Sequence, residues 1–227
     1  MTMFLLRSHF DKLRPDSNLS SMINFVSGIL RISTKYHMTQ LRGKSIGIIQ
    51  EKFPSTLAGC DSVLSKEIKY NPTEIVRVIP LAREANVPLV LPWAFYLCTH
   101  ISVDDILSNT VLSWRDKALC LAGKERLWEM QKTKTHRFLF EFNPSVQCSS
   151  GCTLRHYTTL DWRGAEALRI GPHPLEEYTD WKAFKICGKC MDMMVGQHKE
   201  GRQKVWDLLP SLFQLGTWEQ ISQEQTA

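Results

Sequence analysis

The chain has 227 residues, 43% of them hydrophobic, and a formal net charge of +5 from 28 basic and 23 acidic residues. Its seven tryptophans and ten phenylalanines exclude a disordered chain, because disordered segments are poor in aromatic residues. The basic residues form no run of five or six, so the composition does not predict a nucleic-acid-binding tail. A chain of this length can build the core of one or two small domains.

The first residues, MTMFLLRSHFDKLRPD, lack the pattern of a secretory signal peptide. The apolar run from Met3 to Leu6 is too short, and no small-residue cleavage site follows it. No stretch approaches about 18 consecutive apolar residues, so we expect no transmembrane helix. We therefore expect an intracellular location, in the cytoplasm or the nucleus, where the seven cysteines would serve as thiols or metal ligands rather than disulfides.

The first half of the chain predicts short helices. Two helices are expected at about Phe25 to Tyr36 and about Thr39 to Lys52, the second ending before Pro54. Residues 58–71 are expected to be a weakly ordered linker. A helix should then begin with Asn71 as its cap and a proline in its first position, which suits proline because the N–H at that position has no helical partner.

Proline and glycine are expected to interrupt several of the later helices. Pro80 should kink or divide the helix that follows the linker, and Gly123 either breaks its helix or is tolerated there. Residues 143–180 are rich in glycine, proline and short polar stretches, which predicts a loop-rich insert. A long final helix is expected from Trp181 towards Leu209, ending at or before Pro210.

The remaining helices have recognisable start signals. One should start near Pro92, another at Ser102 with an aspartate three residues later, and a third at Ser113 with the same spacing. The aromatic C-terminal stretch WDLLPSLFQLGTW is expected to fold back and bury its rings. No strand-rich region is predicted, so the expected fold class is mainly α.

Several stretches in this order resemble one protein family over about residues 24 to 221. They are GILRISTKYHMTQLR, LAREANVPLVLPWAFY, LAGKERLWEMQ, the four C-terminal cysteines and GRQKVWDLLPSLFQLGTWEQI. Their order resembles that of BTB/POZ-domain-containing proteins of basidiomycete fungi. The resemblance implies the last helices of a BTB domain in residues 21–57 and a BACK-like helical region in residues 72–221, which carries the cysteine-bearing insert and the long final helix.

One departure from the family limits what the resemblance implies. The strand-rich first half of a BTB domain is missing, which indicates a truncated gene product. BTB-type dimerisation and cullin docking depend on that half and are therefore not carried over. The resemblance implies a non-enzymatic adaptor or scaffold whose partners are other proteins. The alternative is a zinc-dependent, nucleic-acid-associated transcriptional regulator, because BTB domains are also joined to zinc modules.

Four cysteines carry the spacing of a metal site. Cys148 and Cys152 form a C-x3-C pair, and Cys187 and Cys190 follow 34 residues later as a C-x2-C pair. Zinc takes four thiolates in a tetrahedron, and two short-spaced pairs commonly supply them. A zinc site requires the four sulfur atoms to converge to within about 4 Å. His156 and His173 are candidate substitute ligands; otherwise they are surface or hydrogen-bonding residues.

Two other interpretations of these cysteines stay open. Residues recur three or four apart along the final helix, so its two cysteines can instead be buried core thiols; this apolar stripe comprises Cys187, Cys190, Met194, His198, Arg202, Val205 and Leu209. A redox pair would sit at a helix start after a strand, and no strand is predicted before CGKC. Cys60, Cys98 and Cys120 lie outside ligand spacing and are expected to be buried thiols.

No motif in the sequence predicts catalysis. GxSxG, HExxH and GxGxxG are all missing, and GKER at 123–126 lacks the upstream glycine of a phosphate-binding loop. We therefore expect no enzyme and no organic cofactor, with structural zinc as the one candidate ion.

Overall fold

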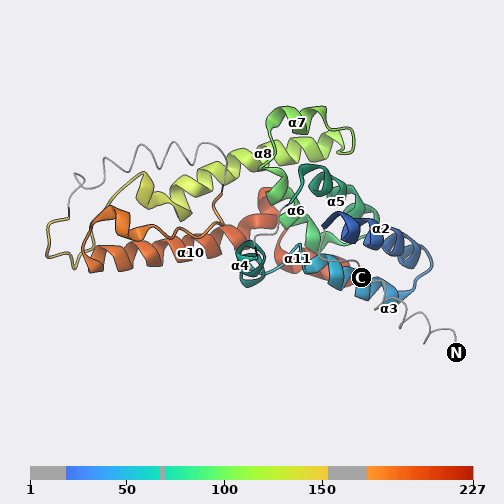
Figure 1. Cartoon of the computed structure of the whole chain (residues 1–227), viewed down its shortest axis with the longest axis horizontal. Coiled ribbons are helices and arrows are strands. Elements are labelled where there is room, and N and C mark those ends of the chain that lie inside the picture. Colours follow the sequence, from blue (N-terminus) through green and yellow to red (C-terminus); the bar gives the residue numbers. More distant parts are fainter. Residues whose placement is uncertain (1–18, 67–69, 153–172, 227) are drawn as a thin grey trace. The chain divides into compact units, whose positions relative to one another are not determined.

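The computed structural model describes residues 19–66, 70–152 and 173–226. This part of the chain forms nine α-helices, several short 3-10 or π turns and no strand, which confirms the mainly α fold (Figure 1). None of the helices described is both long and apolar enough to cross a membrane. The chain divides into two compact units, one comprising the residues up to Ala94 together with those from Ser222 onwards, the other Phe95–Ile221.

The first unit is built on an antiparallel pair of helices. Helix α2 (Leu19–Lys35) and helix α3 (Thr39–Gln50) form this pair, and α5 (Pro72–Glu84) packs against α2. Buried residues recur three or four apart along α2, which explains why this stretch is helical and which face it buries: Leu19, Met22, Ile23, Val26, Leu30 and Ser33. The helix expected from about Phe25 therefore begins earlier, at Leu19.

Two expectations for this unit are corrected. The stretch expected to be a linker contains α4 (Leu57–Ser65), because the hydroxyl of Thr56 accepts the N–H of Gly59 at 3.1 Å and so caps the helix. Pro80 does not divide α5, which runs unbroken to Glu84. A proline removes one backbone hydrogen bond, and the buried face of α5 offsets that loss: Ile75, Val76, Val78, Ile79, Leu81 and Ala82.

The predicted start signals are confirmed. The Asn71 side chain accepts the N–H of Thr73, with Pro72 as the first residue of α5. The hydroxyls of Ser102 and Ser113 each accept the N–H of an aspartate three residues later, at 3.1 Å, and so begin α7 (Val103–Ser108) and α8 (Trp114–Met130). Helix α6 (Leu91–Cys98) follows the 3-10 turn η1 (Pro88–Val90), with its proline in the first turn as expected.

In the second unit the backbone changes pitch after α8. Instead of continuing as an α-helix, the chain forms one π turn, η2 (Gln131–Thr135), and then a 3-10 turn, η3 (Arg137–Leu139). Gly123 is tolerated inside α8. The long helix α10 (Gly188–Leu212) lies beside α8 and η2 (Figure 1).

The ends of the long helix also differ from expectation. Residues Trp181–Phe184 form a separate 3-10 turn, η5, and Lys185 has a left-handed φ of 50°, which an α-helix cannot include. Pro210 lies inside α10 rather than ending it. Beyond α10, the ring of Trp218, the first residue of α11 (Trp218–Thr226), stacks on Trp206 at 5.3 Å, so the C-terminal aromatics fold back as predicted.

Candidate metal centre

The four candidate cysteines come from two separate stretches of the second unit. Cys148 and Cys152 lie in the irregular segment after η3, and Cys187 and Cys190 lie at the start of α10. The described parts of the expected insert, 143–152 and 173–180, contain no helix, which agrees with a loop-rich region. A chain without regular structure needs another means of fixing two side chains beside a helix end, and a shared ion is one.

The structure brings the four sulfur atoms together. No two of them are more than 4.8 Å apart, and the Sγ atoms of Cys148 and Cys187 are separated by 3.7 Å. Tetrahedral Zn–S bonds place sulfur atoms about 3.8 Å apart. One pair is therefore at the zinc distance, and the widest separation allowed by the 4.8 Å bound exceeds it by about 1 Å. The four thiols are free rather than paired in disulfides.

Two backbone N–H groups reach across from one cysteine-bearing stretch to a sulfur atom of the other. The N–H of Cys187 donates to Sγ of Cys152 at 3.3 Å, and the N–H of Ser145 donates to Sγ of Cys190 at 3.4 Å. Each stretch thus supplies a donor to a sulfur of the other. Such donors stabilise the thiolate form, which is the form that binds a metal. The arrangement suits four anionic ligands better than four neutral core thiols.

The first turn of α10 has a positive end without an acidic partner. No Asp or Glu lies in that turn, and the residue that caps it, Cys187, makes no side-chain capping hydrogen bond. A helix N-terminus favours negative charge nearby. Thiolates at Cys187 and Cys190 would supply the charge that an acidic cap supplies elsewhere.

The pKa values of the cluster divide according to environment. Backbone hydrogen bonds from Cys152 and Ser150 lower the pKa of Cys148 to about 6. Burial raises the pKa of Cys190 to about 12. For Cys152, the Cys187 amide lowers the pKa, but burial and the neighbouring thiols outweigh it and leave the pKa raised. One thiol is therefore ready to ionise first, and a divalent cation would drive the others to release their protons.

An aromatic cluster backs the four sulfur atoms on the protein side. Cys190 belongs to its buried core, and the other three cysteines pack against it while partly exposed. Such an apolar shell shields a metal–thiolate centre from water on one side. The buried members of the cluster are Phe138, Leu139, Phe142, Phe184, Cys190 and Met194.

The stripe predicted on the final helix is confirmed from Cys190 onwards, whereas Cys187 precedes the helix as its cap and is only partly buried. The stripe is buried from Cys190 to Leu209, and His198 and Arg202 lie within it at only 3% and 6% exposure. Arg202 donates from Nε and Nη2 to the carbonyl oxygen of Leu175, at 3.0 and 2.8 Å. Burying a charged side chain is costly unless it is hydrogen-bonded, and these two bonds reduce that cost for Arg202. The cysteines therefore pack in or against the core, but helical spacing alone does not explain why all four sulfur atoms lie close together.

Two histidines beside η2 form a second polar group that spacing did not predict. His136 and His198 lie with ring centroids 5.0 Å apart, and Thr135 Oγ1 lies 2.8 Å from Nδ1 of His136. Burial, assisted by the neighbouring His198 and by the charge of Arg202, lowers the pKa of His136 to about 3, and burial also lowers the pKa of His198. Both rings are thus neutral at ordinary pH. The i, i+4 spacing of His198 and Arg202 was visible in the sequence, but their partners are far along the chain.

The other candidate residues lie elsewhere. His173 is outside the four-cysteine cluster and approaches Glu176 at 3.3 Å, and His156 lies outside the described residues. Cys60, Cys98 and Cys120 are buried, as predicted. A hydrogen bond with Cys98, together with burial, raises the pKa of Cys120, so these two thiols are neighbours although their spacing of 22 residues along the chain gave no sign of it.

Comparisons with protein-family models, with curated proteins and with solved structures found no match. The resemblance to fungal BTB/POZ proteins therefore stays a prediction.

Proposed function

We propose that this chain is a non-enzymatic adaptor or scaffold that binds other proteins, and that Cys148, Cys152, Cys187 and Cys190 hold a structural zinc ion in its second unit. The observation that supports the zinc centre is the convergence of four thiols from two stretches of chain to within 4.8 Å of one another, whereas the adaptor role is what the sequence resemblance implies. An ion there would join the irregular insert to the start of α10.

A structural role suits this ligand set better than a catalytic one. Catalytic zinc keeps an open position for water or substrate, whereas four cysteines complete the tetrahedron. The ion would then contribute folding free energy to the insert, which has little apolar periodicity of its own.

A thiol oxidoreductase fits the same residues less well. A redox CxxC pair usually follows a strand at the start of a helix. The described chain before Cys187 is instead the 3-10 turn Trp181–Phe184, although Cys187 is partly exposed and Cys190 fully buried. The Sγ atom of Cys187 lies 3.7 Å from that of Cys148, which belongs to the other pair. Contacts between the two pairs are typical of a metal site that takes ligands from both.

The charges near the cysteines favour protein over nucleic acid as the partner. Lys182, Lys185 and Lys189 are exposed there, but Asp180 and Asp192 are exposed among them. Nucleic-acid-binding zinc modules present a continuous basic face to the phosphates. A mixed surface is typical of the rim of a protein–protein interface. If the chain is instead a transcriptional regulator, its partners should be recovered only through nucleic acid.

The zinc centre is tested by metal analysis of protein purified without chelator. We expect about one zinc per chain, lost in Cys187→Ser. Cys60→Ser removes a buried thiol outside the cluster and should keep the metal, which makes it the matched control. Substitution with Co²⁺ should give the thiolate-to-metal and d–d absorption of a tetrahedral four-sulfur site. Metal-free wild-type protein with unchanged unfolding after zinc addition would overturn the centre.

The adaptor role is tested by quantitative affinity purification. Wild-type chain, Cys187→Ser and Cys60→Ser are compared, each with and without nuclease. Proteins recovered at near-stoichiometric amounts in a nuclease-resistant manner would support the adaptor. Recovery that nuclease abolishes would favour the regulator, and recovery of neither class of partner would overturn both.

A further inference from the structure

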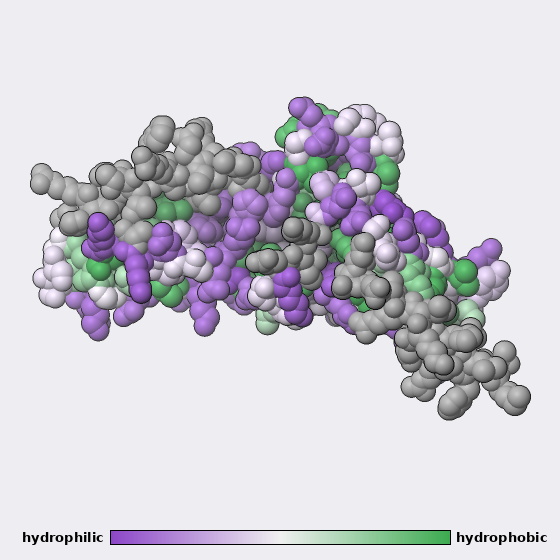
Figure 2. Space-filling model, viewed as in Figure 1, coloured by the Kyte–Doolittle hydropathy of each residue, from purple (hydrophilic) through white to green (hydrophobic). Residues whose placement is uncertain are grey.

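The turn between α2 and α3 exposes apolar side chains on the first unit. Ile32, Tyr36 and Met38 are 54%, 65% and 40% exposed. We call these three residues, with Lys35 and His37, the α2–α3 turn surface. Scattered exposed apolar residues are ordinary, but three within seven positions mark a patch. Figure 2 shows hydrophobic and hydrophilic atoms next to one another on the visible face at this end of α2 and α3.

The backbone of this turn is fixed rather than loose. The N–H of Met38 donates to the carbonyl oxygen of Ser33 at 2.8 Å, and His37 has a left-handed φ of 53°. This is a helix-ending motif in which glycine usually occupies the left-handed position and the next residue covers an apolar side chain one turn back. Here the two positions one turn back are Ser33 and Ile32, and both Ile32 and Met38 remain exposed, at 54% and 40%.

A side chain other than glycine at position 37 has a conformational cost. A left-handed conformation costs an L-residue about 1 kcal/mol or more, and glycine avoids that cost. The imidazole of His37 is nevertheless placed in the exposed turn between Tyr36 and Met38. A contribution of the side chain to binding would offset this conformational cost.

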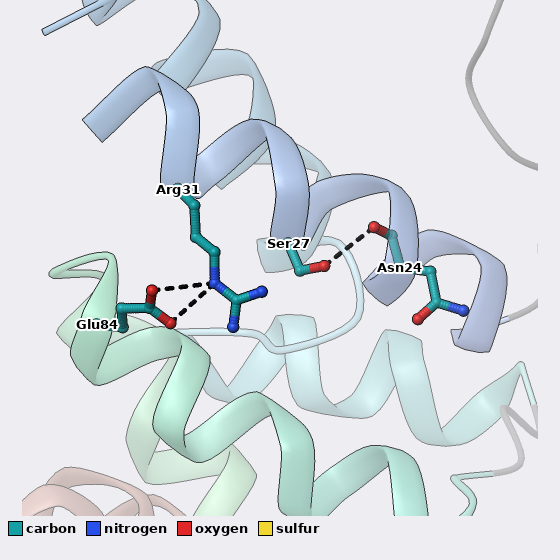
Figure 3. A network of polar contacts seen from close by, with 4 residues as sticks. All are labelled: Asn24, Ser27, Arg31 and Glu84. Atoms are coloured by element: carbon teal, nitrogen blue, oxygen red, sulfur yellow. Dashed lines mark hydrogen bonds and ion pairs between the residues drawn. The ribbon is translucent and has the colours of Figure 1, made fainter. Parts of the chain in front are cut away.

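The charge of this helix pair has one sign. From Leu19 to Gln50 the chain carries Arg31, Lys35, Arg42 and Lys44, and neither aspartate nor glutamate. The Nε of Arg31 donates to both carboxylate oxygens of Glu84, at 3.0 and 2.9 Å, and is thereby neutralised (Figure 3).

The cations nearer the turn are not neutralised in the same way. Arg42 donates to the backbone oxygens of Ala85 and Asn86, which leaves its charge uncancelled. Within the described part of the chain no carboxylate pairs with Lys35, whose Nζ lies 5.6 Å from the centre of the Tyr36 ring.

We propose that the α2–α3 turn surface docks an acidic peptide segment that carries an apolar or aromatic anchor, supplied by a partner protein. Tyr36 and Met38 would cover the anchor, because aromatic residues and methionine are enriched at interface cores. Lys35 and Arg42 would attract the partner's carboxylates. The inference rests on the adaptor role proposed above and names the chemical class of one partner.

A peptide fits this surface better than a nucleic acid. Nucleic-acid affinity comes mainly from several cations that each contact a phosphate. The turn has few cations but exposes apolar side chains. Burying that apolar surface against an apolar side chain of a partner is favourable. A small patch of this kind is typical of a transient interface with a short linear segment.

The test begins with a random dodecapeptide library panned on the full chain as purified. Selected peptides should be enriched in Asp and Glu next to Leu, Phe or Trp. Fluorescein-labelled copies are then titrated by fluorescence anisotropy. Tyr36→Ser should weaken binding by about tenfold or more, Lys35→Glu should weaken it comparably, and added salt should weaken it further. His37→Gly should bind less tightly while unfolding at higher denaturant concentration.

Trp114→Ser is the matched control, because Trp114 is 75% exposed and lies in the other unit. This variant should bind the selected peptides as wild type does. The proposal is overturned if no peptides are selected, if they lack acidic residues, if Tyr36→Ser binds them unchanged, or if a labelled single-stranded oligonucleotide competes them off at the same surface. If cellular partners copurify equally with wild type and Tyr36→Ser, this surface is wrong while the adaptor role stands.

Discussion

Nδ1 of His198 lies 2.6 Å from the carbonyl oxygen of Thr135. On the other side of the ring, Nε2 accepts the backbone N–H of Tyr178 at 3.0 Å. The ring is therefore neutral, with its proton on Nδ1. One side chain of α10 thus holds both the π turn η2 and the segment before η5, which joins three parts of the second unit.

Replacing His198 by leucine should lower the free energy of unfolding by about 2–4 kcal/mol, because the Thr135 oxygen and the Tyr178 N–H lose their buried partner. His198→Gln should lose less, since its amide can donate and accept. Urea denaturation followed by circular dichroism measures both. Lys199→Leu, at the exposed neighbouring position, is the control and should stay within about 0.5 kcal/mol of wild type. If His198→Leu left the free energy of unfolding unchanged, the two hydrogen bonds would make no net contribution to stability.

Acidification should destabilise the second unit through His136. Its pKa is about 3 in the folded protein, below the ordinary value of 6.5, because the ring is buried near Arg202 and His198. The unfolded chain takes up the proton first as pH falls. The stability is therefore complete above pH 6.5 and declines by about 1.4 kcal/mol per pH unit below it, until the pH passes the folded pKa.

The measurement is the denaturation midpoint as a function of pH for wild type and His136→Gln. The slope of the variant should be shallower between about pH 6 and pH 4. Cysteine ligands also take up protons in this range, so both proteins must have the same metal content, and only the difference between their slopes reports on His136. Parallel slopes would contradict the assignment.

Local signals were predictable from the sequence because each depends on neighbours in the chain. The caps at Ser102 and Ser113 and the proline start of α5 need only residues within one helical turn. The buried stripe of α10 also follows from spacing alone. By the same reasoning, four cysteines in two short-spaced pairs could be assigned to one group before their distances were known.

Features that depend on contacts between distant segments were not predictable. The π turn η2 forms where the chain packs against α10, and no local residue marks it. The bonds of His198 reach 63 residues back along the chain to Thr135, so its neighbours in the sequence do not reveal them. The break between η5 and α10 lies at Lys185, whose left-handed backbone is unusual for any residue other than glycine.

Gly123→Ala should destabilise the packing of α8. A Cβ there would lie 2.0 Å from Cε1 of Phe213, whose ring is fully buried and stacked on Phe95 at 5.2 Å. We expect a loss of about 1–3 kcal/mol, since overpacking forces the ring or the helix to move. Phe213→Leu leaves room for the methyl group, so in the double variant the two losses should not add. Additive losses in urea denaturation would place the strain elsewhere.

Gly201→Ala should be more damaging, because the obstacle is backbone rather than a side chain. A Cβ at position 201 would lie 2.3 Å from the carbonyl oxygen of Lys134 in η2. To relieve that clash, α10 must move away from η2, which would stretch the neighbouring bond between His198 and Thr135. We expect a loss of about 3 kcal/mol or more.

Gly196→Ala is the control on the same helix, since a Cβ there meets nothing within 4 Å, and it should gain about 0.5–1 kcal/mol from the better helix former. Equal effects of the two substitutions in thermal or urea unfolding would show that α10 does not approach η2 as closely as described.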